Sequence, residues 1–185
     1  MSFGSILLGA LIGGVISGGG VIGITFLTAV PAILWWHMLL IAVGGTFIGG
    51  FIGGLVAKGG GAGALAGLLS GLVVFLATFL FAWLYYKAEL IALVASSPDV
   101  ATLVNDFLTS VGMAGTQVGL VIEQWILDNA PTIGDITAFA NANFIYFALI
   151  VGAILGGLAS LVNFFAGLIG GLITRKKKES YDSYY

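Results

Sequence analysis

Apolar positions along this chain gather into four long stretches, and none of the four contains Asp, Glu, Lys or Arg. The stretches are residues 3–30, 32–57, 63–86 and about 144–174. Each is long enough to cross a bilayer, since a transmembrane helix needs roughly 20 residues. The first far exceeds the roughly 7–15-residue apolar core of a cleaved signal and has no basic segment before it, so we expect a genuine span there. The pattern predicts an all-α membrane protein with four transmembrane helices.

Polar positions concentrate in one connection, residues 87–143, which holds six acidic residues against Lys87 alone. We expect residues 87–95 to continue the third span as helix. Apolar residues then recur at helical spacing in two further segments, first at Val100, Leu103, Val104, Phe107 and Leu108, and then at Val118, Val121, Ile122, Trp125 and Ile126. We expect Ser97 to be the N-cap of the first segment and Asp135 to cap the entry to the last span. The connection is therefore predicted to be a small helical domain.

The composition agrees with this pattern and narrows the class of protein. Hydrophobic residues make up 59% of the chain and charged residues 8%, whereas a soluble domain has about 25% charged residues. The chain has no cysteine, which excludes disulfides, thiolate catalysis and cysteine metal sites. The expected organisation is three spans in residues 1–86, a helical extracytoplasmic loop in 87–143, a fourth span in 144–174 and a tail in 175–185.

The positions of the basic residues predict the orientation. Lys and Arg in short segments beside a span favour the cytoplasmic side. Residues 175–178 are all basic and follow the fourth span, and Lys58 lies in the short link between the second and third spans. We therefore expect a multi-pass protein of the cell membrane with both termini in the cytoplasm. Trp35, Trp36 and Trp83 then fall at the outer ends of the spans, where aromatic rings favour the interface.

Many glycines in the spans recur at a spacing of four residues. This spacing places small residues on one helix face and lets helix backbones approach closely. The predicted packing residues are Gly9, Gly13, Gly45, Gly49, Gly53, Gly63, Gly67, Gly71, Gly152 and Gly156. The bundle itself can use these faces. Because Gly13 has Gly14 beside it and Gly49 has Gly50, a second face can instead serve self-association. Close packing also explains residues 18–20, three consecutive glycines, although a kink or an unwound turn is the alternative.

Polar residues within the spans are mild, and the absence of ionisable groups argues against a proton-coupled carrier. Asn163 is the strongest hydrogen-bonding group in a span, and we expect it to bond between helices. The alternative is a pore in an oligomer, for which the candidate lining residues are Asn163, Ser160, Ser70 and Thr46.

No catalytic or cofactor motif accompanies the spans. The single histidine, His37, has no acidic neighbour in sequence, and Asp128, Asn129 and Asp135 do not have the spacing of a calcium loop. Nucleic-acid binding would need a basic face, and only residues 175–178 are basic. We expect no enzyme activity, no cofactor, no metal and no nucleic-acid partner.

The layout resembles that of the tetraspanins. It has a tight outer turn at Pro31, a short inner link from Lys58 through three glycines, a large helical outer loop at 87–143 and a short tail. The resemblance covers the topology of the whole chain and no sequence motif, because the Cys-Cys-Gly motif of that family is missing, as are its polar residues in the spans. It implies a non-enzymatic protein that organises membrane partners or shapes membrane patches.

The sequence thus predicts an integral membrane protein that organises the bilayer or its partners through glycine-lined packing and a helical ectodomain. Its partners are expected to be lipid and either further copies of the chain or another membrane protein. The expected interaction surface comprises Phe107, Trp125, Trp35, Trp36 and Trp83. A subunit of an oligomeric channel is the alternative, and a membrane enzyme comes third.

Overall fold

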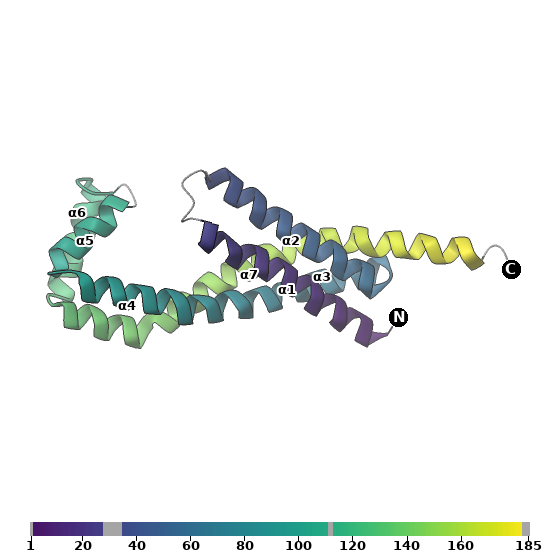
Figure 1. The fold of residues 1–185 in the computed structure, drawn as a ribbon, viewed down its shortest axis with the longest axis horizontal. Coiled ribbons are helices and arrows are strands. Elements are labelled where there is room, and N and C mark those ends of the chain that lie inside the picture. Colours follow the sequence, from purple (N-terminus) through teal and green to yellow (C-terminus); the bar gives the residue numbers. More distant parts are fainter. Residues whose placement is uncertain (1, 28–34, 111–112, 183–185) are drawn as a thin grey trace. The chain divides into compact units, whose positions relative to one another are not determined.

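A computed structural model describes residues 2–27, 35–110 and 113–182, and nearly all of these residues are helical (Figure 1). The elements are α1 (Phe3–Leu27), α2 (Trp35–Ala57), α3 (Gly60–Phe81), the π-helical η1 (Ala82–Tyr86), α4 (Lys87–Ser96), α5 (Val100–Ser110), α6 (Gln117–Asn129) and α7 (Ile133–Asp182). No strand occurs within the described ranges. The predicted all-α class is confirmed.

Four of the helical stretches are long and apolar enough to cross a membrane, which confirms the predicted number of spans. They are Phe3–Ile24, His37–Ala57, Gly60–Ser96 and Ile133–Thr174. The last two have 37 and 42 residues, far more than the roughly 20 that a bilayer requires. The chain is therefore consistent with a multi-pass integral membrane protein in which two helices extend beyond the hydrocarbon layer.

Helix α7, which contains the expected fourth span of about 144–174, begins well before residue 144, and Asp135 caps its start as predicted. Its first residue is Ile133, directly after Thr132. The Thr132 amide and hydroxyl both donate to the Asp135 carboxylate, at 3.0 and 2.5 Å, and the Asp135 amide donates back to the Thr132 hydroxyl at 3.2 Å. This reciprocal capping arrangement satisfies donors that a helix start leaves unpaired, so the helix begins here.

The predicted N-cap of α5, Ser97, was wrong. The Asp99 carboxylate accepts a hydrogen bond of 2.7 Å from the Thr102 amide, so Asp99 caps this helix. Ser97 instead ends α4, where its hydroxyl donates to the carbonyl of Leu93 at 3.1 Å. Pro98 lies between Ser97, which ends α4, and Asp99, which caps α5.

Two residues, Lys58 and Gly59, connect α2 to α3. Both have positive φ angles, 57° and 123°, so the chain reverses through left-handed conformations that glycine tolerates and lysine rarely adopts. The Gly63 amide closes the turn by donating to the Gly59 carbonyl at 2.7 Å. An unwound turn was one alternative for residues 18–20, but α1 runs through them as continuous helix.

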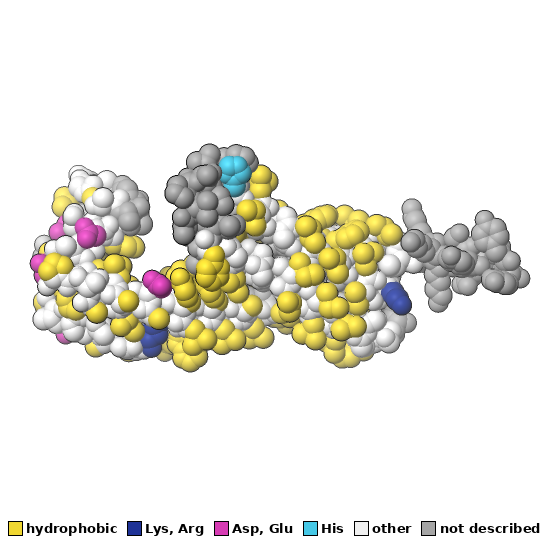
Figure 2. Space-filling model, viewed as in Figure 1, with side chains coloured by type: hydrophobic (Ala, Val, Ile, Leu, Met, Phe, Trp, Pro, Cys, Tyr) yellow, Lys and Arg dark blue, Asp and Glu magenta, His cyan; other side chains and the backbone are white. Residues whose placement is uncertain are grey.

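The chain forms two compact units, Met1–Phe81 with Ala148–Tyr185, and Ala82–Phe147. The first unit, called here the span unit, contains α1 to α3 and the later part of α7. The second, called here the loop unit, contains η1, α4 to α6 and the first turns of α7, and includes the predicted connection 87–143. On the face drawn in Figure 2, hydrophobic side chains cover much of the span unit, while the acidic side chains in view belong to the loop unit.

Candidate functional site

Close contact between backbones joins the helices of the span unit. A Cβ atom added to any of the ten predicted packing glycines would lie within 3.4 Å of an atom from another helix. On Gly13 it would lie 2.7 Å from the carbonyl oxygen of Gly49, and on Gly53 it would lie 2.6 Å from that of Gly9. On Gly67 it would strike the carbonyl oxygen of Asn163. Larger residues at these positions would force the helices apart.

The adjacent glycine pairs serve two neighbours within one chain. Gly13 faces α2 and Gly14 faces α3, while Gly49 faces α1 and Gly50 faces α7. The second faces, which the sequence left open to self-association, are thus occupied inside the span unit. Other glycines, including Gly19 and Gly157, have nothing within 4 Å of an added Cβ atom.

A buried group of polar side chains, called here the polar node, joins all four spans at one point. Asn163 of α7 donates from Nδ2 to the Ser70 hydroxyl of α3 at 2.6 Å. The Ser17 hydroxyl of α1 lies 3.2 Å from both Asn163 Oδ1 and the Thr46 carbonyl of α2, so its single hydrogen can serve either acceptor. Ser70 donates onward to the Gly67 carbonyl at 2.6 Å. The side chains of Ser17, Thr46, Ser70 and Asn163 are all buried.

Every buried side-chain nitrogen and oxygen atom in the described part of the chain has a hydrogen-bond partner. Three of the four candidate pore residues, Asn163, Ser70 and Thr46, are buried, and Thr46 donates within its own helix to Ala42 at 2.7 Å. The fourth, Ser160, is half-buried and donates to the Leu68 carbonyl at 3.2 Å. Because an unpaired polar group in hydrocarbon is costly, these bonds explain how the spans tolerate polar residues.

The loop unit is packed in another way, by large aliphatic side chains. Val100, Val104 and Leu108 of α5 are buried together, and isoleucines and a leucine of α6 and α7 pack against them. Ile122, Ile126 and Leu127 supply the α6 side of this cluster. The predicted apolar stripe of α5 is therefore largely internal, except that Phe107 is 55% exposed.

The remaining half of the predicted α6 stripe faces outward. Val118, Val121 and Trp125 recur at helical spacing, with Val121 68% and Trp125 61% exposed. We call these three residues the α6 face. Leu120 is also exposed but lies on another side of the helix. A helix that packs only two residues of its apolar stripe, both half-buried, against its own unit leaves the rest for another surface.

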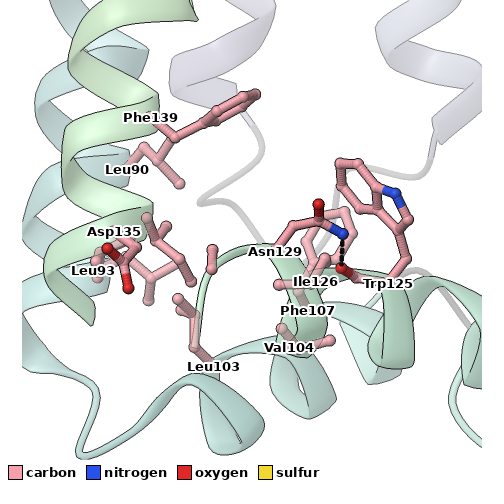
Figure 3. A pocket seen from close by; sticks show the side chains of 13 residues that line it. Leu90, Leu93, Leu103, Val104, Phe107, Trp125, Ile126, Asn129, Asp135 and Phe139 are labelled. Atoms are coloured by element: carbon pink, nitrogen blue, oxygen red, sulfur yellow. Dashed lines mark hydrogen bonds between the residues drawn. The ribbon is translucent and has the colours of Figure 1, made fainter. Parts of the chain in front are cut away.

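A cavity of about 490 Å³ lies within the loop unit, and Figure 3 shows its walls. Leu90, Leu93 and Phe139 line it from α4 and α7, opposite Trp125 and Ile126 of α6, with α5 residues between them. Besides the indole of Trp125, only two side chains with polar atoms, those of Asn129 and Asp135, are among its thirteen lining residues. Both are engaged elsewhere, since Asn129 donates to the Trp125 carbonyl at 2.8 Å and Asp135 accepts from Thr132.

The predicted interaction residues lie in different parts of the chain. Phe107 and Trp125 both line the cavity, and Trp83 is exposed in η1. The side chains of Trp35 and Trp36 lie outside the described part of the structure. The cavity itself carried no signal in the sequence, because residues of four separate helices form it and each reads as an ordinary apolar position.

Groups that could ligate a metal ion do not converge in the described residues. No three His, Asp or Glu side chains among them lie close enough to hold a metal ion. Asp99 has a lowered pKa because the Thr102 amide and hydroxyl stabilise its carboxylate. That shift accompanies helix capping and marks no reactive site.

No family description matches this chain, and neither a curated protein nor a solved structure matches it. The four membrane-capable helices are compatible with a four-span architecture like that of the tetraspanins, and the likeness is one of layout.

Proposed function

We propose that this chain is a non-enzymatic integral membrane protein that organises membrane partners through its loop unit. Its spans form a glycine-lined anchor, and its α6 face recruits either a second copy of the chain or another membrane protein. The exposed α6 face is the observation that carries this proposal. Neighbouring apolar side chains on the surface of an acidic helical unit mark an interaction surface, because exposing such a patch to water is unfavourable.

The proposed placement puts the loop unit outside the cell membrane and both termini in the cytoplasm. The basic residues support it, since Lys58 is exposed at the α2–α3 link and residues 175–178 follow the last span. Cysteines introduced at Ser2, Gly61, Ser97 and Ser183 would test it with a membrane-impermeant thiol reagent on intact cells. Only Ser97→Cys should react, and labelling at Gly61→Cys would overturn the orientation. Gly61 suits this test because nothing lies within 4 Å of an added Cβ atom.

The channel alternative is less well supported. Its candidate lining residues would need to face a shared aqueous axis, whereas Asn163, Ser70 and Thr46 are buried and hydrogen-bonded inside one chain. This arrangement favours an anchor over a pore. No described contact supports the pore independently, so the scaffold is the function that we propose.

The association test compares two charge-adding variants of α6. Val121→Glu places a carboxylate on the α6 face. Gln117→Glu places one in the first turn of the same helix, where a negative charge interacts favourably with the helix dipole. The mass of the protein is measured by native mass spectrometry from lipid nanodiscs. We expect the wild type and Gln117→Glu to retain a bound copy or partner and Val121→Glu to lose it while keeping its helicity. An assembly that survives Val121→Glu at full strength would contradict the proposal.

A further inference from the structure

We propose that the cavity of the loop unit binds one hydrocarbon chain of a membrane lipid whose headgroup carries no net negative charge. This inference goes beyond the proposed function, because the cavity can hold a lipid chain whichever partner the α6 face recruits.

The size and lining of the cavity suit an apolar ligand. Its volume of about 490 Å³ falls within the roughly 300–1,000 Å³ of sites that enclose small molecules. An apolar cavity of about 150 Å³ already stays dry and binds benzene. The cavity here is larger and open, and a hydrocarbon that enters it removes apolar surface of both the wall and the ligand from water.

The polar atoms of the lining are unsuited to recognising a polar ligand. Asn129 donates one amide hydrogen to the Trp125 carbonyl, and the Asp135 carboxylate accepts two hydrogen bonds from Thr132 at the start of α7. A polar metabolite would have to compete for these groups and would lose its own hydration on the remaining apolar wall. A hydrocarbon chain makes no such demand.

The bilayer is the natural source of the chain, because the walls belong partly to membrane-capable helices. Leu90, Leu93 and Val94 lie in the apolar helix Gly60–Ser96, and Asp135, Ile136 and Phe139 lie in Ile133–Thr174. Nearly half of the lining is thus built on the same two helices that cross the hydrocarbon. Leu93, Phe107 and Phe139 are each more than half exposed, so the cavity is open for entry.

The charge of the loop unit selects the headgroup. Six acidic residues face only one basic residue, Lys87, between Ala82 and Phe147. Such an excess repels an anionic headgroup held near the cavity. A zwitterionic or neutral lipid experiences no comparable repulsion.

The test uses the full chain in nanodiscs of phosphatidylcholine that contains a trace of phosphatidylcholine with a diazirine in one acyl chain. After irradiation, cross-linked residues are mapped by mass spectrometry. We expect adducts on cavity residues of α5 and α6, such as Val104 and Ile126, in addition to those on the outer surfaces of the spans. Adducts confined to the spans would overturn the proposal.

Two substitutions make the test specific. Ala130→Phe fills the cavity from its wall, and its matched control, Ala138→Phe, adds the same side chain at an exposed position outside the lining. We expect Ala130→Phe to lower labelling of α5 and α6 by about tenfold and Ala138→Phe to leave it unchanged. Unchanged labelling in a folded Ala130→Phe protein would refute the site.

A second variant covers the case in which Ala130→Phe fails to fold. Leu93→Asp places a charge at the exposed edge of the cavity, where it costs the fold little but should exclude the chain. It is expected to lower α5 and α6 labelling as well. A phosphatidylglycerol probe with the same diazirine chain should label these helices less than the phosphatidylcholine probe, and equal labelling would contradict the headgroup preference.

Discussion

The span unit and the loop unit are both helical, yet different contacts hold each together. Glycine backbones and the polar node join the spans, whereas Val100, Val104 and Leu108 form an aliphatic core in the loop unit. Between spans, lipid tails are as apolar as leucine, so association depends on close packing and hydrogen bonds. In water, removing aliphatic surface is itself stabilising, by about 25 cal/mol per Å². The difference follows the solvent that each unit is expected to meet.

The same comparison changes the meaning of an exposed apolar residue. Leu11, Leu72 and Leu161 of the span unit are exposed, and a bilayer would cover them without any partner. Val121 and Trp125 of the loop unit are as exposed, but they belong to a helix too short to cross a membrane. The proposed interaction surface rests on this second kind of exposure.

The largest effect is expected where the span unit has no room for a side chain. A Cβ atom on Gly156 would lie 2.6 Å from Phe75 Cβ and 2.9 Å from the Gly71 carbonyl oxygen. Gly156→Leu should destabilise the fold by more than about 3 kcal/mol, since overpacking already costs about 1–3 kcal/mol where side chains alone must move. Thermal unfolding in detergent, followed by circular dichroism, measures it.

Gly157→Leu is the matched control, because nothing lies within 4 Å of a Cβ atom at the adjacent Gly157. It should leave the melting temperature near that of the wild type. If both leucine variants melt alike, close packing at Gly156 does not hold the span unit together, and the contrast between the units fails.

The glycine spacing illustrates what sequence can and cannot predict for the spans. Hydrophobic length predicted four helices, and the four-residue period singled out positions such as Gly49 and Gly67 that lie against other helices. The period could not say which helix each glycine faces. That choice depends on the relative rotation of all the spans, so neither the use of Gly50 by α7 nor the meeting of Ser17 with Asn163 could be read from local pattern.

The loop unit is expected to lose stability when aliphatic side-chain volume is removed from its core. Leu108 is 2% exposed and lies in the α5 core, whereas its neighbour Phe107 is 55% exposed. Leu108→Ala should destabilise the loop unit by about 2 kcal/mol, the low end of the range for such substitutions, because a small core can partly collapse. Phe107→Ala should cost less. Amide hydrogen exchange of α5 and α6 measures both, and equal protection in the two variants would contradict the assigned core.

Helix ends in the loop unit were harder to predict than its apolar stripes. Helical spacing identified both segments and the inward side of α5. Ser97, Asp99 and Thr132 are all residues that favour helix caps, and propensity alone could not rank them. The choice depended on the backbone conformation around each residue, in which Ser97 bonds back to α4 while Thr132 pairs with Asp135. The cavity was beyond prediction for the same reason, since it exists only once four helices are placed.

A smaller effect is expected at the polar node. Asn163→Ala removes the bonds to Ser70 and Ser17, and should destabilise the span unit by about 1–2 kcal/mol, because interhelical hydrogen bonds in membranes average about 0.6 kcal/mol and reach about 1.7. The control is Asn143→Ala, since Asn143 bonds within its own helix to Phe139. An unchanged melting temperature together with an altered ion leak in proteoliposomes would contradict the packing role and favour the pore.

The smallest expected effect is a pH dependence confined to the loop unit. Hydrogen bonds from Thr102 lower the pKa of Asp99 below its ordinary value of 3.8 in the folded state. The folded chain therefore binds fewer protons at this carboxylate than the unfolded chain. The stabilisation of α5 is present above pH 3.8 and is lost as the pH falls through the lowered pKa. Hydrogen exchange of α5 between pH 6 and pH 3, corrected for intrinsic rates, should show this loss in the wild type and in Asp106→Asn, which removes a carboxylate two turns later. It should be absent in Asp99→Ala, and a loss of protection of equal size in that variant would show that Asp99 is not the group responsible.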